Sequence, residues 1–515
     1  MASRARTSTS PDGAKTRRRG DPYSRPSNPQ NQSNVENPVG LFVKNQCDAE
    51  LTHVEDAPFA PLVPYVPRWN RHLPDTDLDS SEHNSVLAAY FSLSCSWNMI
   101  VNPTCFVRDY AKALSQEIGE EVAHYSPMLH NAMLAFALAF SSNQAHQSVE
   151  FRRRFVTQAK VYVDTECQAP TLSTVQGLAI LSCFHSGAAE LVLSFTYLGM
   201  AMRVSQALNL ENMKLGTRLN DIDYQRACVF WSLFSMDKCG SLYVGRPQTL
   251  APSFEGPYQP PGTPPIDYGV DVGMECLQPP PSHVSGPPNI AFIWYIKVMR
   301  IIQLAMKMLY GKNGVCNPIV DIRHIEYISG QLERWKRDLP GSLRIDDKDP
   351  DLHVTPEVTM VNLMCEWMHI LLYQPFYQDR SSIRYITTPV HQIGFSDQDY
   401  TRVSQQRERA YQTATPAAER ILFLLEKFDS EHGLDKMDNA SVQIAYVAGK
   451  IHYLGIIDST SAVHRSMSSK DGMEKAIQLL RRMGSIWGSA VASANRLEEL
   501  FTTASGNALG ENSAS

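Results

Sequence analysis

Apolar residues recur at the spacing of an α-helix in nearly every segment from Ser85 onward, and this pattern limits the fold more than any other feature. The alternating pattern of a half-buried β-strand is nearly absent. The sequence therefore predicts an all-α fold. Helices are expected at 85–94, 105–119, 127–142, 148–166, 171–187, 190–209 and 221–242, and again at 290–310, 321–338, 356–374, 401–428, 438–456 and 470–500.

Two parts of the chain lack this helical pattern. Residues 1–80 are rich in Ser, Pro, Asn and Arg, so we predict a disordered basic and proline-rich tail. Residues 252–288 contain eleven prolines, a density that no helix tolerates, so we predict a long internal loop. These breaks and the link at 378–400 predict a central helical domain at 85–380 and a C-terminal helical region at 401–500.

The composition is that of an ordinary globular protein, with 43% apolar and 19% charged residues. No apolar leader resembling a signal peptide is present, and the most apolar segment, 292–309, carries four polar residues at helical spacing. We expect these residues to form one solvated stripe on a buried helix, and we expect no membrane association. They are Lys297, Arg300, Gln303 and Lys307.

The net charge of −6 is unevenly distributed along the chain. Residues 1–30 hold seven basic and two acidic residues, which leaves a balance of about −11 for the rest. The short basic run predicts a nuclear-localisation signal or a contact with nucleic acid, and a plain solvated tail is the alternative. The candidate residues are Lys15, Arg17, Arg18 and Arg19.

The ten cysteines are separated by at least ten positions and include no C-x2-C pair. This spacing does not predict a structural zinc site, and the size of the chain argues against a disulfide scaffold. The fifteen histidines include no i, i+4 pair, so we predict no metal site and treat histidines such as His185 and His369 as core or boundary residues.

Ser235 and Lys238 match the S-x-x-K spacing of serine acylases. The other sequence elements of that chemistry are absent, and so are a phosphate loop, a nucleophile elbow and a dinucleotide fingerprint. We therefore interpret the pair as two polar residues at the exposed edge of a structural helix, and we predict no enzymatic activity and no catalytic residue.

Asp237 and Arg246 lie in the most hydrophobic neighbourhood of the chain. A charge held in such surroundings must be paired and hydrogen-bonded. We hypothesise that the two residues form an ion pair, or that each caps a neighbouring helix end, and that they determine how the chain leaves the helix.

The segment 226–250 resembles the middle homology region of fungal zinc-cluster (Zn2Cys6) transcription factors, and the branch of nitrogen-assimilation and xylan-type regulators is the most similar. The family pattern has an Arg where this chain has Lys238. The segments LERWKRDLP (332–340) and MHILLYQPF (368–376) resemble two further helices of the family. The matching residues are Arg226, Phe230, Trp231, Phe234, Asp237, Ser241, Gly245, Arg246 and Pro247.

The resemblance implies a nuclear transcriptional regulator whose 85–380 region is an effector-responsive regulatory domain. It also implies control of a metabolic or secondary-metabolite gene set. Its expected partners are other transcription factors or a second copy of the chain, with promoter DNA reached through a partner or an upstream module. A small-molecule effector could bind between the helices.

Family members usually carry six zinc-ligating cysteines near the N-terminus, whereas the first 94 residues here contain only Cys47. No zinc cofactor is therefore expected. The basic segment 15–22 resembles the one that follows the last zinc ligand, which suggests either a natural regulator without that module or a gene model missing its first exon. A helical scaffold, or a dominant-negative partner of intact relatives without DNA binding of its own, is the alternative function.

Overall fold

The computed structural model describes residues 69–115, 122–212, 221–244, 247–250, 289–310, 322–346, 348–349, 352–377, 397–457 and 463–511. Regular structure in these ranges is helical and includes no strand, which confirms the predicted all-α class. No helix among them is both long enough and apolar enough to span a membrane.

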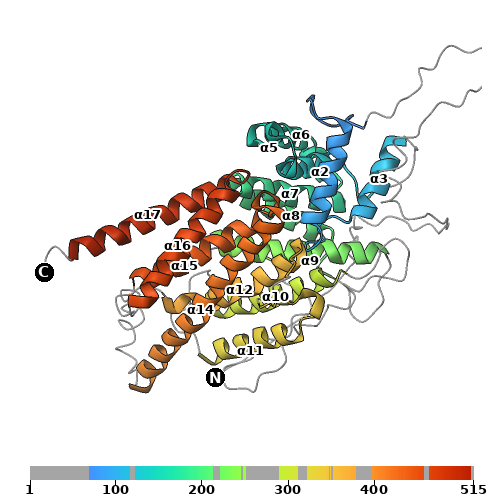
Figure 1. The fold of residues 1–515 in the computed structure, drawn as a ribbon. Coiled ribbons are helices and arrows are strands. Elements are labelled where there is room, and N and C mark those ends of the chain that lie inside the picture. Colours follow the sequence, from blue (N-terminus) through green and yellow to red (C-terminus); the bar gives the residue numbers. More distant parts are fainter. Residues whose placement is uncertain are drawn as a thin grey trace, which may run out of the picture.

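The first group of helices packs through apolar faces around α4 and α7 (Figure 1). α4 contacts α2, α6 and α7, and α7 in turn packs against α8. Ser126 caps α4 by accepting a hydrogen bond from the Leu129 amide (3.1 Å), and Pro127 follows at the first helical position. The group consists of α2 (Ser80–Leu93), α3 (Pro103–Ser115), α4 (Pro127–Ala137), α5 (Gln144–Gln147), α6 (Val149–Gln168), α7 (Leu172–Gly187) and α8 (Leu191–Ala207).

The second group continues through α9 and α10, which lie between the first helices and the C-terminal ones (Figure 1). α9 contacts α7, α8 and α10; α10 contacts α12, and α12 packs against α14 and α15. The group consists of α9 (Asp221–Val244), α10 (Ile290–Tyr310), α11 (Ile322–Asp338), α12 (Pro356–Tyr377), α14 (Asp397–His432), α15 (Ala440–Ile457), α16 (Val463–Met483) and α17 (Gly488–Glu511).

Some predicted boundaries are wrong. Residues 69–79 belong to the folded part rather than to a disordered tail, because Trp69 packs against His83, with ring centres 4.8 Å apart, and Leu78 is buried. The predicted helix 470–500 is two helices, α16 and α17, separated by a turn at 484–487. The helix expected at 127–142 ends at Ala137 and continues as a 3-10 turn. The predicted loop 252–288 lies outside the described residues.

The polar stripe predicted on 292–309 is also wrong in part. Arg300 and Gln303 are buried in α10, and the Arg300 guanidinium lies 5.7 Å from the centre of the Trp231 ring. The middle of the expected stripe is therefore enclosed, and α9 packs against this helix, whereas Lys307 at the end of the stripe is exposed.

The first and last parts of the described chain meet at the start of α17. Trp487 is 1% exposed and packs against Phe136 and Phe140 of the first group, with ring centres 5.2 and 6.2 Å away. Its indole Nε1 donates to the Met437 carbonyl (2.9 Å). Gly187 is required beside it, because a Cβ there would lie 2.6 Å from the indole.

Arg152 connects the same two parts through hydrogen bonds. Its side chain is buried, its Nε donates to the Gln147 carbonyl (3.0 Å) and its Nη2 donates to the Ile486 carbonyl (3.0 Å). The guanidinium also lies 5.4 Å from the Trp487 ring centre, in cation–π contact. Helices separated by more than 300 positions thus share one core.

His452 makes the stability of this core dependent on pH. Its buried ring lies between α15 and α16, so close to the backbone that a Cβ at Gly472 would be 2.4 Å from it. Neither ring nitrogen has a hydrogen-bond partner. Burial lowers the pKa of His452 to about 4, with a further contribution from the positive charge of Lys475.

We predict that His452→Leu reduces the acid sensitivity of folding. In the unfolded chain this imidazole titrates near 6.5, so the unfolded state takes up the proton first and stability falls as the pH drops from about 6.5 to 4. Between pH 7 and pH 5 the wild type should lose about 2 kcal/mol more unfolding free energy than the variant. Urea denaturation at both pH values measures this, with His353→Leu, at an exposed site, as the control. Equal losses in the wild type and His452→Leu would contradict the prediction.

Candidate functional site

The three aromatic residues of the family motif point from α9 into the hydrophobic core of the protein. Phe230, Trp231 and Phe234 are fully buried. The Trp231 ring meets both phenylalanines edge to face, with ring centres 5.4 and 5.2 Å apart. This arrangement is favourable for aromatic rings and orients α9 against its neighbours.

A buried ion pair follows directly after these aromatics. Lys238 Nζ lies 2.7 Å from Asp237 Oδ2, and the two residues are 0% and 1% exposed. The carboxylate also accepts the backbone N–H groups of Thr249 (3.0 Å) and Leu250 (2.8 Å). The ammonium donates to the Leu250 carbonyl and lies 4.3 Å from the Phe234 ring centre. The pair thereby holds residues 249–250 against α9.

The other family-motif residues are less closely connected. Arg226 Nη2 donates to the Leu208 carbonyl at the end of α8 (2.7 Å). Pro247 is exposed, and its carbonyl accepts from the Ser241 hydroxyl (3.3 Å). Gly245 and Arg246 lie outside the described residues, so the hypothesised Asp237–Arg246 pair is untested, and the cation seen beside Asp237 is Lys238.

Ser235 and Lys238 do not lie at an exposed edge, as expected from the sequence, but are both fully buried. The Ser235 hydroxyl donates to the Ser232 carbonyl (2.7 Å), whereas the Lys238 ammonium binds Asp237 and Leu250. These hydrogen bonds of the two side chains go to different partners and do not form a nucleophile–base pair.

Metal-binding residues do not gather anywhere in the described ranges, where no group of three or more His, Cys, Asp or Glu side chains could hold an ion. The described cysteines are free, and although Cys228 and Cys239 share α9, no group of three or more potential metal ligands forms among the described residues. His185 instead binds Glu190 (Nδ1–Oε2, 2.5 Å), and His369 contacts the Cys365 carbonyl (3.0 Å). The basic residues Lys15, Arg17, Arg18 and Arg19 lie outside the described part.

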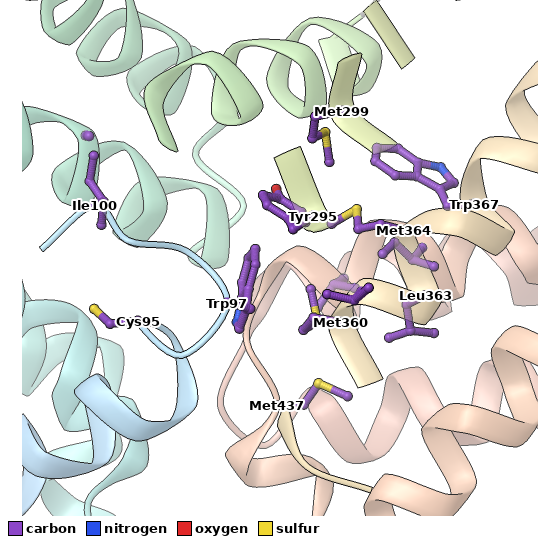
Figure 2. Close-up of a cluster of buried hydrophobic side chains, with 14 of the residues drawn as sticks. Cys95, Trp97, Ile100, Tyr295, Met299, Met360, Leu363, Met364, Trp367 and Met437 are labelled. Carbon is purple, nitrogen blue, oxygen red and sulfur yellow. The ribbon is translucent and has the colours of Figure 1, made fainter. Parts of the chain in front are cut away.

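A cavity of about 160 Å³ lies between the two groups of helices. Its walls are largely apolar and aromatic, and α2, α7, α8, α9, α10, α12 and α15 all contribute to them. Figure 2 shows several of these side chains, with Trp97 and Tyr295 close together and Met364 and Trp367 following one another on α12. The Trp97 and Tyr295 rings meet edge to face at 5.2 Å. The position of the cavity between several helices is typical of small-molecule sites in helical proteins.

Asp438 is the acidic residue of this cavity. It is buried just before α15, where its Oδ2 accepts from the Ser94 hydroxyl (2.7 Å) and its Oδ1 from the Ala440 amide (3.0 Å). Burial raises the pKa of this carboxyl, while the two hydrogen bonds act in the opposite direction. The residue connects the end of α2 to the start of α15, 344 positions later.

The other titratable groups of the wall are held in their neutral form. Burial raises the pKa of the Cys239 thiol to about 12 and raises the pKa values of Cys183, Tyr90 and Tyr295. These thiols are therefore not nucleophiles at neutral pH, since the thiolate is the reactive form. The wall suits binding rather than covalent chemistry.

The cavity reaches the surface at the N-terminal part of α8. Leu191 and Phe195 line it and are also 36% and 44% exposed, and the neighbouring Val192 is 82% exposed. Large apolar side chains at such exposure mark a contact surface or the mouth of a binding site.

Residues 87–254 match the family model of the fungal specific transcription factor domain. This segment is similar to a fungal specific transcription factor domain. It holds the described motif residues of α9 and the α2, α7 and α8 walls of the cavity.

Three curated proteins that are similar to this chain are named as transcriptional regulators. The nitrogen assimilation transcription factor nirA of Emericella nidulans is 25% identical over 76% of this chain and 42% of its own length. The nitrogen assimilation transcription factor nit-4 of Neurospora crassa is 23% identical, over 72% and 33%. An uncharacterised transcriptional regulatory protein of Schizosaccharomyces pombe is 24% identical, over 39% and 24%.

The chain thus spans less than half the length of the curated relatives that it matches. The domain family and these relatives are transcription factors, which agrees with the interpretation that the chain is not an enzyme.

The resemblance allowed for a small-molecule site between the helices, but the sequence did not predict which residues line the cavity. Tyr295, Met364, Trp367 and Asp438 complete its wall from positions beyond the matched segment. The only signal in the sequence is that Asp438 stands at the start of the predicted helix 438–456, where helix-capping residues are common. Nothing in the linear pattern brings that residue to Ser94.

Proposed function

We propose that the protein is a transcriptional regulator of fungal type that acts in the nucleus and controls a metabolic or secondary-metabolite gene set. Its helical domain is the effector-responsive module of this regulator. The observation that carries the proposal is the domain match at 87–254, together with two relatives named as nitrogen assimilation transcription factors. The cavity between the helix groups supports the effector-responsive role, because its wall is built from helices that are far apart in the sequence, and a ligand bound there would contact both groups.

The regulator reaches promoter DNA through a partner or an upstream module. The cysteine spacing of this chain does not fit the zinc cluster that reads DNA in this family, so no step is assigned to zinc. Its partners are other transcription factors or a second copy of the chain. The basic run Lys15, Arg17, Arg18 and Arg19 serves nuclear import.

A helical scaffold that binds intact relatives and blocks them is the second candidate. The exposed apolar side chains of Leu191, Val192, Leu193 and Phe195 favour it, since an apolar helix face of this kind suits contact with another protein. Pull-down with full-length relatives separates the two functions when combined with a reporter gene, because a scaffold represses the relatives' targets and an activator does not.

Deletion of the gene is expected to cause a coordinated loss of transcripts from one set of genes. RNA sequencing of the deletion strain measures this loss. Reintroduction of the wild-type gene should restore the transcripts, whereas a variant with Gln at Lys15, Arg17, Arg18 and Arg19 should restore fewer and accumulate outside the nucleus. An unchanged transcriptome in the deletion strain would contradict the proposed function.

A further inference from the structure

We infer that the cavity between the two helix groups binds a small, uncharged cyclic molecule that carries both a hydrogen-bond donor and an acceptor, such as a single aromatic ring with an amide group. This inference deepens the effector-responsive role and rests on it for its biological meaning. The binding itself is a property of the described residues and can be measured without any transcription assay.

The size and walls of the cavity set the bulk of the ligand. A dry apolar cavity of about 150 Å³ is large enough to take up benzene, and this cavity measures about 160 Å³. Its wall includes the aromatic side chains of Tyr90, Trp97, Phe136 and Tyr295. Flat rings pack well against such side chains at edge-to-face or offset geometry. The exposed Leu191 and Phe195 provide the route from solvent.

Three polar atoms without a hydrogen-bond partner belong to residues that line the cavity, and they indicate which functional groups the ligand carries. Asn98 Oδ1, Gln443 Oε1 and Trp367 Nε1 belong to residues that line the cavity, and each atom is buried without a hydrogen-bond partner. Leaving such atoms unpaired is unfavourable, so a ligand that satisfies them gains affinity. The two oxygens require a donor, and the indole N–H requires an acceptor. A primary amide supplies both.

The charges around the cavity exclude an ionic ligand. Among the described residues of the wall there is no Lys, Arg or His, so an anion would meet no counter-charge. The carboxyl of Asp438 adds an unfavourable neighbour for an anion. Both Asp438 oxygens already accept hydrogen bonds, from the Ser94 hydroxyl and the Ala440 amide, so this group is not held ready for a cation.

The test uses four ring compounds of similar size and different charge with the full-length protein. Benzamide is neutral with a donor and an acceptor, toluene is neutral without either, benzoate is an anion and benzylamine is a cation. Isothermal titration calorimetry and ligand-observed NMR should show benzamide binding more tightly than toluene, with benzoate and benzylamine at least tenfold weaker than benzamide.

Two variants connect the binding to the cavity. Gln443→Leu removes one unpartnered oxygen while keeping the side-chain bulk, and should weaken benzamide about tenfold while leaving toluene unchanged or slightly tighter. Gln225→Leu is the matched control, because Gln225 also has a buried unpartnered amide group but lies on α9 outside the cavity wall. It should leave the affinities for both probes unchanged.

The outcomes are distinct. Tight binding of benzoate or benzylamine, equal affinities for all four probes, no binding of any probe, or no effect of Gln443→Leu on benzamide each overturns the inference. None of these results affects the transcript profile of the deletion strain. Conversely, an unchanged transcriptome with selective benzamide binding would remove the regulatory role and leave the ligand class established.

Discussion

A Lys238→Met variant is expected to lose about 3–5 kcal/mol of unfolding free energy, the range measured when one partner of a buried ion pair is removed. The methionine keeps the bulk of the side chain but leaves the Asp237 carboxylate, 1% exposed, without its cation. The Leu250 carbonyl also loses its donor. Chemical denaturation monitored by tryptophan fluorescence measures the change.

Two controls make this result specific to the ion pair. Lys475→Met removes a lysine whose ion pair with Glu426 is about 44% exposed, and should change stability by less than about 1 kcal/mol. The double variant Asp237→Asn/Lys238→Met should cost clearly less than the sum of the two single variants, since the pair acts as a unit. A loss of under 1 kcal/mol in Lys238→Met would show that the pair does not hold residues 249–250.

Trp487→Ala is expected to cost about 3–5 kcal/mol, the usual cost of removing a large buried aromatic side chain. It would leave a void against Phe136 and Phe140 and leave the Met437 carbonyl without its indole donor. Arg152 would also lose one of its two cation–π contacts and keep the one with Phe184. Because the side chain joins the first and last helices, the loss should appear as a lower midpoint of one cooperative transition.

Phe501→Ala is the matched control for this substitution. Phe501 lies on the same helix, α17, but is only half-buried, so its removal should cost markedly less. Equal losses in the two variants, or a separate early transition for the C-terminal helices in Trp487→Ala, would show that Trp487 does not connect the two parts of the core.

The helices were largely predictable because their cause is local. A helix is indicated by signals only a few residues apart. Examples are the helical spacing of Phe230, Trp231 and Phe234 and the N-terminal capping pair Ser126–Pro127. The turn at 484–487 was missed because no proline marks it and because apolar spacing continues across it. Residues 69–79 were misjudged because their order comes from contacts with α2 and α4, such as that of Trp69 with His83, and not from their composition.

The candidate site was much less predictable, because its parts come together only in the folded chain. The sequence correctly indicated that a charge in the α9 neighbourhood must be paired, but it did not point to the adjacent Lys238 as a partner of Asp237, and the hypothesised pair with Arg246 stays a prediction. A lysine at a helix surface and a lysine buried under a folded-back segment have the same local pattern. The hydrogen bond of Asp438 to Ser94, and with it the cavity, depends on packing across 344 positions.

The junction at Trp487 and Arg152 also has a consequence for synthesis on the ribosome. The Ile486 carbonyl, which accepts a hydrogen bond from the Arg152 guanidinium, is synthesised 334 positions after Arg152. At translation rates of about 5–20 residues per second, this interval lasts roughly 15–70 s. During it the emerging α7 helix exposes a face that α17 will cover, and Phe136 of α4 lacks the Trp487 ring that will pack against it, so this part of the chain is a natural client of ribosome-associated chaperones.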